Sequence, residues 1–148
     1  MTTYAQRYVK LLPGDCDIPV LLDIHRLPGI ARFIGIDSEH YFNYVTSTDG
    51  VYYYKVYLDE MLVGSVHLEQ DRNTLTLSLL VIPEYQNLGI ASRILEDVKS
   101  GVLISGFSEI RVSVERENVP SLHLFEKAGF VLRGEEDGLL DYVYDNNT

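Results

Sequence analysis

The stretch LLVIPEYQNLGIAS, residues 79–92, places a buried strand, a short polar turn and the start of a helix in immediate succession. In the preceding TLTLSLLVI, leucine alternates with threonine or serine until both faces become apolar at Leu79, as expected of a strand end buried on both sides. Gly89 and Ala91 leave almost no side chain at the mouth of the helix, where unpaired N–H groups attract anions. The stretch predicts either an anion-binding turn or a tight connection whose small residues serve helix packing.

Composition and charge limit the class of protein. A chain of 148 residues suits one domain, which we expect to span residues 1–148. Twelve basic against 22 acidic residues give a net charge of −10, which argues against nucleic acid as a partner and favours a cationic one, although acidity also serves solubility alone. Neither G-x-x-x-x-G-K-[ST] nor G-x-G-x-x-G occurs, so nucleotide hydrolysis and dinucleotide binding are not indicated.

Cysteine and histidine content bears on location and metal binding. Cys16 is the single cysteine, so no internal disulfide is possible, and MTTYAQRYVK lacks the basic and apolar pattern of a secretory signal. No apolar run approaches the roughly 18 residues of a membrane-spanning helix. We therefore expect a cytoplasmic protein without a membrane partner. The four histidines and one cysteine show no paired ligand spacing, so no metal site is expected.

Hydrophobic periodicity predicts an α+β fold with one mixed sheet. Pro28 and Gly29 are expected to end the first helix, Ser38 to cap the second, and Asn118 and Gly129 to bound the last. The third expected helix, which starts near residue 91, is expected to bury a stripe that includes Ala91, Ile94, Leu95, Val98 and Val102. The expected strands cover 8–12, 51–58, 62–69, 74–82, 110–114, 130–134 and 139–145, and the expected helices cover 18–27, 38–46, a segment starting near 91 and a segment between 118 and 129.

Two segments of the sequence resemble the GNAT superfamily of acyl-CoA-dependent N-acetyltransferases. Gln86, Gly89 and Ala91 match the central signature [QR]-x-x-G-x-[GA], and LLVIPEYQ resembles the strand that precedes it in that family. NVPSLHLFEKAGF, residues 118–130, resembles a second recurrent segment, and the element order fits over nearly the whole chain. The resemblance implies three layers, with a mostly antiparallel sheet of about seven strands flanked by about four helices. The pattern is most similar to the ribosomal-protein N-terminal acetyltransferase branch.

The resemblance also implies a substrate and its site. Acetyl-CoA would be the acyl donor, with its pantetheine arm between two splayed central strands and its pyrophosphate at residues 87–92. The backbone of residues 80–82 would hydrogen-bond the pantetheine, and Asn118 would meet the arm again. The expected CoA-binding residues are Leu80, Val81, Ile82, Gln86, Asn87, Leu88, Gly89, Ile90, Ala91, Ser92, Asn118 and Ser121.

Acetyl transfer to an amine needs a proton acceptor for the amine and a proton donor for the thiolate. Many family members carry a tyrosine acid where this chain has Phe125, which cannot donate a proton. Ser121 fits the N-x-x-S form of the family and could hydrogen-bond the sulfur, or it could simply lie in the first turn of a helix. Glu115 and Glu69 are the candidate bases, with solvated carboxylates or a water chain as alternatives. His67 could also move protons or be structural.

The acceptor is expected to be a primary amine that attacks the thioester directly, because Cys16 lies far in sequence from both motifs. The hypothesis is a small cationic amine or a peptide N-terminus. The competing hypothesis is a non-catalytic acyl-CoA-binding or interaction module, which Phe125 supports. We expect a monomer or homodimer. The residues expected to form a cation-attracting cleft are Phe33, Tyr41, Tyr44, Tyr52, Tyr54, Asp23, Asp37 and Glu39.

Overall fold

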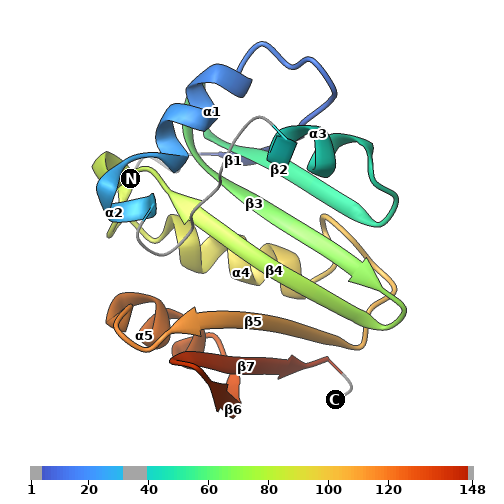
Figure 1. Ribbon diagram of the computed structural model, residues 1–148, viewed down its shortest axis with the longest axis vertical. Coiled ribbons are helices and arrows are strands. Elements are labelled where there is room, and N and C mark those ends of the chain that lie inside the picture. Colours follow the sequence, from blue (N-terminus) through green and yellow to red (C-terminus); the bar gives the residue numbers. More distant parts are fainter. Residues whose placement is uncertain (1–4, 32–39, 147–148) are drawn as a thin grey trace.

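A seven-stranded sheet runs through the whole computed structural model, which describes residues 5–31 and 40–146 (Figure 1). The expected cap Ser38 and three residues of the expected cleft, Phe33, Asp37 and Glu39, lie outside the described residues. The strand order is β1-β2-β3-β4-β5-β7-β6. The strands are β1 (Gln6–Lys10), β2 (Val51–Leu58), β3 (Met61–Asp71), β4 (Thr74–Val81), β5 (Glu109–Glu115), β6 (Val131–Glu136) and β7 (Leu139–Asp145).

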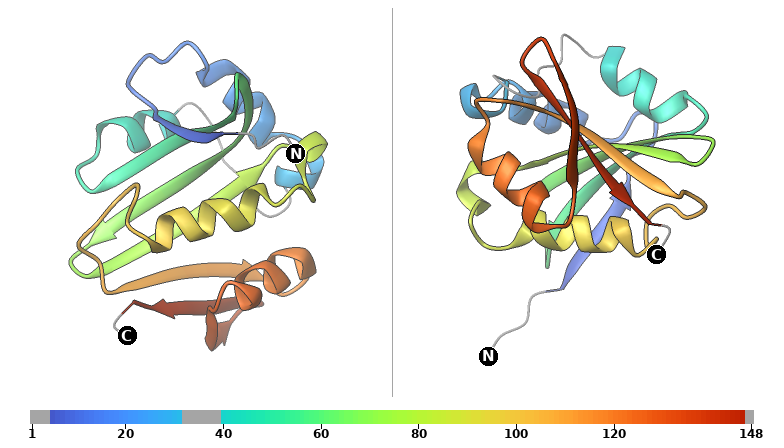
Figure 2. Two further views of the ribbon diagram at one scale, coloured as in Figure 1. Left: turned by 180° about the vertical axis from the view of Figure 1, so that it is seen from behind. Right: turned by 90° about the horizontal axis from the view of Figure 1, so that it is seen from below.

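Helices cover both faces of the sheet, which confirms the expected three-layer α+β fold (Figure 2). The right-hand view, seen from below, shows α1 and α3 on one face and α4 and α5 on the other. Each face buries its own apolar cluster, one centred on Ile94 and Phe125 and the other on Leu21 and Phe42. The described helices are α1 (Ile18–His25), α2 (Pro28–Ala31), α3 (His40–Ser47), α4 (Ile90–Lys99) and α5 (Val119–Lys127), with a 3₁₀ turn η1 at Pro83–Tyr85.

The single parallel pair of neighbouring strands, β4 and β5, separates almost at once. Their register holds only at Thr74 with Glu109, Leu75 with Ile110 and Thr76 with Arg111, although both strands continue beyond these rungs. All other neighbours in the sheet are antiparallel. The expected splaying of the two central strands is therefore present.

The end of β4 keeps an unpaired backbone edge toward β5. The Ile82 N–H donates to the Val63 carbonyl on β3 at 2.8 Å. Because backbone groups alternate in direction along an antiparallel strand, Leu79 and Val81 direct theirs away from β3 and into the gap. Buried backbone groups need partners, so this edge is suited to an extended polar ligand.

Gly64 allows β3 to approach this part of β4 closely. The register between β2 and β3 shifts next to Gly64, leaving Val63 opposite no residue of β2, as in a β-bulge. A Cβ on Gly64 would lie 2.3 Å from the Leu80 carbonyl oxygen. Only a glycine allows β3 and β4 to lie this close, so the position of the β4 end depends on the bulge at Gly64.

Two expectations about helix ends are wrong. Pro28 does not terminate α1 but opens the short helix α2, since proline is well tolerated at a first helical position. Val102 is not part of the buried stripe of α4, because the helix ends at Lys99 and Gly101 takes a φ of 79°. Val102 is 65% exposed as a result.

Candidate functional site

The turn between β4 and α4 presents a helix start with open space in front of it. Gly89 is the N-cap of α4 with a φ of 83°, a conformation that glycine adopts without strain. Apart from the adjoining backbone, no atom of the described residues lies within 4 Å of the place where a Cβ on Gly89 would be. The first N–H groups of α4 therefore face a space that a ligand could enter.

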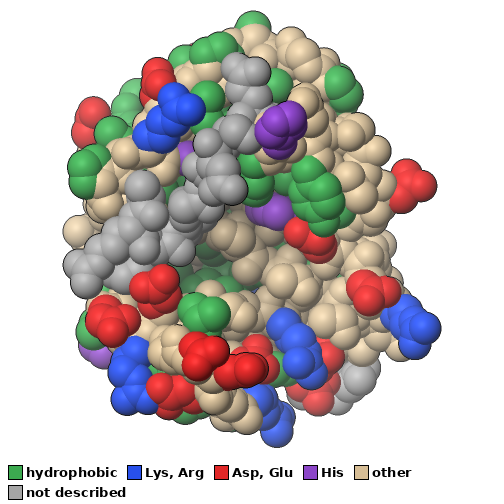
Figure 3. All heavy atoms as spheres, viewed as in Figure 1, with side chains coloured by type: hydrophobic (Ala, Val, Ile, Leu, Met, Phe, Trp, Pro, Cys, Tyr) green, Lys and Arg blue, Asp and Glu red, His purple; other side chains and the backbone are tan. Residues whose placement is uncertain are grey.

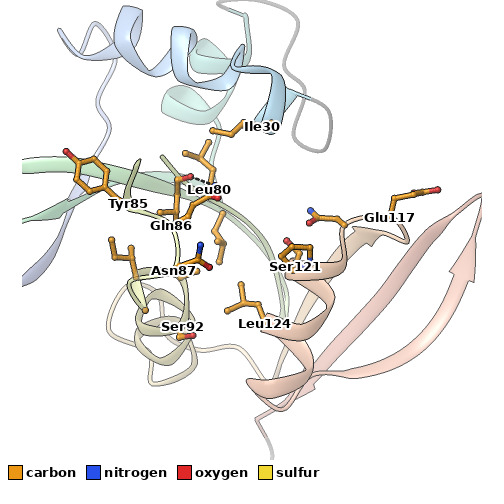
Figure 4. Close-up of a pocket in the computed structure, with 17 residues that line it drawn as sticks. Ile30, Leu80, Tyr85, Gln86, Asn87, Ser92, Glu117, Ser121 and Leu124 are labelled. Carbon is orange, nitrogen blue, oxygen red and sulfur yellow. Dashed lines mark hydrogen bonds between the residues drawn. The ribbon is translucent and has the colours of Figure 1, made fainter. Parts of the chain in front are cut away.

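Gln86 stabilises this turn through the backbone. Its Nε2 donates to the Val81 carbonyl oxygen at 3.0 Å, the hydrogen bond drawn in Figure 4. This carbonyl faces the gap and has no partner on β5. The glutamine therefore satisfies one group of the β4 edge, while Leu79 and the Val81 N–H remain directed into the gap.

A cavity of about 520 Å³ lies between the end of β4, the turn and the start of α5. Figure 4 shows Ser121 and Leu124 on one side of it and Asn87 and Gln86 on the other. The residues that line it are Gly29, Ile30, Leu79, Leu80, Val81, Tyr85, Gln86, Asn87, Gly89, Ile90, Ala91, Ser92, Glu117, Asn118, Pro120, Ser121 and Leu124.

Most of the expected CoA-binding residues line this cavity, but two do not. Ile82 bonds to Val63 through its N–H, and its side chain packs on the α1–α3 side of the sheet. Leu88 is 64% exposed. The sequence did not indicate the contributions of Gly29 and Ile30, because no local pattern shows that α2 folds over the far end of β4.

A smaller cavity of about 100 Å³ continues into the gap between β4 and β5. It brings together Glu115 from β5 and Ser121 from α5, two of the three expected catalytic residues. Asn118 and Ser121 line both cavities and connect them. The residues of the smaller cavity are Leu77, Ser78, Leu79, Val112, Ser113, Val114, Glu115, Asn118, Ser121 and Phe125.

Two residues at the start and middle of α5 determine the chemistry available there. Asn118 is the N-cap, as expected, but its side chain makes no capping hydrogen bond to the helix. Phe125 is buried, lines the smaller cavity and packs edge-to-face on Phe130. The position at which the resemblance described above implies a tyrosine acid is therefore apolar here.

Glu69, the third expected catalytic residue, lines neither cavity. Its carboxylate accepts a hydrogen bond from the Tyr44 hydroxyl at 2.8 Å and lies 2.8 Å from Nε2 of His67. Nε2 of His67 forms no hydrogen bond among the described residues, so its approach to Glu69 is a close contact rather than a hydrogen bond. Nδ1 of His67 lies 2.8 Å from the Tyr41 hydroxyl.

The protonation of this group follows from burial. Burial lowers the pKa of His67, and the nearby Glu69 carboxylate only partly opposes that shift. Burial, with Tyr53 and Glu69 nearby, raises the pKa of Tyr41, which therefore stays a neutral donor to Nδ1. His67 is thus neutral near pH 7, with its proton on Nε2, and leaves the charge of Glu69 in place.

The expected aromatic cleft is only partly formed. Tyr41 and Tyr44 lie with Glu69 and His67, but Tyr52 and Tyr54 pack on the α4 side of the sheet. Side chains alternate along β2, so Tyr53 points to the α3 side instead, where its hydroxyl donates to Ser65 at 2.7 Å. Asp and Glu side chains gather around the hollow on this face of the molecule (Figure 3).

One group of side chains with metal-binding potential lies far from both cavities in the fold. Asp15, Cys16 and Asp17 bring their ligand atoms within 4.8 Å of one another. However, Nζ of Lys55 lies 2.9 Å from Asp15 and 2.8 Å from Asp17. Burial disfavours the charged lysine, but hydrogen bonds to Asp17 and Asp15 outweigh burial and raise the pKa of Lys55. The ammonium therefore already bridges these two carboxylates and compensates one of their two charges.

A sequence model of the acetyltransferase (GNAT) family matches residues 19–130. This range includes the residues that line the two cavities. The chain belongs to this family. Streptothricin acetyltransferase from Escherichia coli is 30% identical to this GNAT protein over 83 residues, which cover 55% of this chain and 48% of that protein. The match therefore spans about half the length of that relative.

Solved structures of GNAT enzymes share the fold. Spermidine N-acetyltransferase from Vibrio cholerae, in complex with CoA and spermine, has a TM-score of 0.76 and 19% identity, with 95% of each chain covered. An aminoglycoside N(6′)-acetyltransferase from Legionella pneumophila has a TM-score of 0.80 and 15% identity, with 99% of this chain and 95% of that chain covered. At these identities the likeness shows the fold alone. No helix in the described part of this GNAT chain has the length and apolar character to cross a membrane.

Proposed function

We propose that this protein transfers the acetyl group of acetyl-CoA to a primary amine by direct attack. The observation that carries the proposal is the separation of β4 from β5 beyond Thr76 and Arg111, which opens the cavity beside the glycine-containing turn. The GNAT family match supports the same reaction.

The cavity suits the parts of acetyl-CoA in order along its length. The gap-facing backbone groups of Leu79 and the N–H of Val81 can continue a β-ladder with the amides of a pantetheine arm. The start of α4, opened by Gly89, can bind the pyrophosphate through backbone N–H groups. Asn118 retains an uncommitted amide side chain where the two cavities meet.

Glu115 and Ser121 are the residues that we assign to proton movement. When bound, acetyl-CoA would supply the electrophilic thioester carbonyl. Glu115 lies at the gap and can accept, directly or through water, the proton that the acceptor's ammonium group loses to become the attacking neutral amine. Ser121 can donate a hydrogen bond to the departing sulfur, a task that Phe125 cannot perform.

The proposed acceptor is a small cationic amine or a peptide N-terminus. Acidic side chains around the hollow and the net charge of −10 favour cations near the site (Figure 3). Cys16 is free and exposed, which suits a reducing compartment, so a cytoplasmic location is part of the proposal. A monomer or homodimer of the single domain completes it.

Thermal unfolding with and without acetyl-CoA tests the donor site. At about 100 times the dissociation constant, ligand linkage predicts roughly 2.7 kcal/mol of stabilisation, or about 5 to 10 °C. Gly89→Val should abolish this rise, because its side chain would occupy the open space at the helix start. Gly138→Val is the matched control, since Gly138 has a φ of 81° and equally open surroundings in another turn. Absence of a rise in the unmodified protein would refute the donor site.

Release of free thiol distinguishes the enzyme from a non-catalytic acyl-CoA binder. The protein is expected to release CoA when acetyl-CoA and a cationic amine are both present, and Glu115→Gln should slow the release. Binding of acetyl-CoA without thiol release from any amine in a broad panel would favour the non-catalytic alternative.

A further inference from the structure

Glu69 is held in a fixed position on the α3 side of the sheet, outside both cavities. Tyr44 donates to Oε1 at 2.8 Å, and Nε2 of His67 lies 2.8 Å from Oε2. Oε1 thus accepts a hydrogen bond from α3 and Oε2 lies against the His67 ring of β3, so contacts from two elements orient the carboxylate.

The two contacts fix Glu69 without cancelling its charge. Tyr44 is a neutral donor, and burial keeps His67 neutral near pH 7. Within the described residues, no lysine or arginine pairs with Glu69, whereas Asp141 on β7 and Glu109 on β5 both pair with Arg111, at 3.7 and 3.1 Å. Glu69 is therefore an oriented negative charge without a cationic partner among residues 5–31 and 40–146, and its side chain is 40% exposed.

The same carboxylate lies near the reaction gap. Glu69 is opposite Thr76, the last residue of β4 that pairs with β5, and His67 is opposite Ser78, which lines the smaller cavity. From strand spacing and rise, the backbones of Glu69 and Ser78 lie roughly 8 Å apart. A chain of a few bonds would therefore be long enough to link a cation bound to Glu69 with an amine placed at the gap.

We propose that Glu69 is a specificity-determining residue that binds a second cationic group of the acceptor, with Tyr44 and His67 as its positioning residues. This rests on the proposed function, because the first amine must lie at the acetyl-transfer gap. The acceptor class is a dication whose two cationic groups are separated by a short flexible chain.

Equilibrium binding of putrescine and butylamine, measured by calorimetry with CoA present, tests the proposal. The two amines share a carbon chain and differ in the second ammonium. Putrescine should bind about tenfold more tightly, as expected for a hydrogen-bonded contact between two charged groups. Glu69→Gln should remove this preference, while Glu60→Gln, an exposed carboxylate in the β2–β3 turn, should preserve it. Equal affinities in the unmodified protein, or a preference that survives Glu69→Gln, would overturn the assignment.

Tyr44→Phe separates positioning from general structure. It should weaken putrescine binding and leave butylamine binding unchanged. In the double variant with Glu69→Gln it should have no further effect, because both changes act on one contact. An additive loss, or an equal loss for both amines, would assign Tyr44 a purely structural role and remove this part of the proposal.

Failure of this inference can be told apart from failure of the acetyltransferase proposal. Glu69→Gln should leave the acetyl-CoA-dependent rise in unfolding temperature unchanged. If acetyl-CoA binds and butylamine is acetylated without any diamine preference, only the role of Glu69 fails. If acetyl-CoA does not bind, the reaction fails, and the putrescine and butylamine comparison without CoA still decides whether Glu69 binds a second cation.

Discussion

Among single residues, the buried His67 should make the stability of the fold depend on pH. Its ring faces the Tyr41 hydroxyl on α3, the Glu69 carboxylate, and Tyr53, which is its partner on β2. The His25 ring packs against both Tyr41 and Tyr53. Burial lowers the pKa of His67 below its usual value of about 6.5. The unfolded chain then binds a proton at a higher pH than the folded chain does, so the free energy of unfolding should fall as pH drops below that value.

The expected result is a lower unfolding temperature at about pH 5.5 than at about pH 7.5. His67→Gln keeps a polar side chain of similar reach but does not titrate, so its stability should change less over this interval. The comparison between the two proteins isolates His67 from other titrating groups, including His25. A variant as sensitive to pH as the unmodified protein would show that His67 does not cause the effect.

Ser121 carries the second prediction at this scale. It is polar, lines the smaller cavity together with Glu115, and has the buried Phe125 one turn further along α5. Ser121→Ala should lower kcat at least about tenfold and leave the acetyl-CoA affinity nearly unchanged, if its hydrogen bond forms mainly as the sulfur leaves. Ser92→Ala, at the turn, is the control and should affect acetyl-CoA affinity more than kcat. An unchanged kcat for Ser121→Ala would indicate that water, rather than Ser121, donates the proton to the departing sulfur.

At the scale of elements, the bulge of β3 sets the end of β4. A Cβ on Gly64 would meet the Leu80 carbonyl oxygen at 2.3 Å and Cα of Val81 at 3.3 Å, and both are backbone atoms of the gap-lining strand. Gly64→Ala should therefore destabilise the protein by about 2 kcal/mol or more, and should also weaken acetyl-CoA binding.

Gly134→Ala is the matched control for this prediction. Gly134 also lies in a strand without a positive φ, but it is exposed on the edge strand β6 and no atom lies within 4 Å of an added Cβ. Denaturant unfolding of both variants provides the measurement. Equal stabilities would show that β3 and β4 can separate without cost.

Sequence periodicity predicted the elements whose burial pattern is local. The strand 51–58 was placed to the residue, and the order of elements from β2 to β7 was correct, because alternation and small turn residues are encoded within each segment. The bulge at Gly64 was missed, since it depends on contact with Leu80 of another strand. Pro28 was misplaced because proline suits both the end of one helix and the start of the next.

In the candidate site, too, local features could be predicted from the sequence, whereas contacts between separate elements could not. The turn around Gly89 could be predicted because its small residues and following helix are contiguous in the sequence. Glu69 was singled out as a base, but its partners Tyr44 and His67 come together only when α3 packs on the sheet. Spacing along one chain does not show which residues of separate elements will meet, so these contacts required the structure.

At the scale of the whole molecule, the charges of protein and donor have the same sign. The chain carries a net charge of −10, and none of the described residues lining the larger cavity is a lysine or arginine. The basic residue nearest the turn in sequence, Arg93, is 65% exposed at its side chain and pairs with Asp97 at 3.1 Å. Binding of the CoA phosphates would therefore depend on backbone N–H groups against a repulsive long-range field.

Salt should consequently affect the two substrates in opposite directions. Between about 0.01 and 0.1 M ionic strength the Debye length shrinks from about 30 to about 10 Å, which screens repulsion of acetyl-CoA and attraction of a cationic amine alike. The dissociation constant of acetyl-CoA should stay level or decrease, while the KM of the amine should rise severalfold. Calorimetry for the donor and thiol release for the acceptor, each over a sodium chloride series, provide the measurement. Acetyl-CoA affinity that falls steeply with salt would instead mean that cationic side chains such as Arg93 leave their partners and bind the phosphates, and Arg93→Gln would then flatten the dependence.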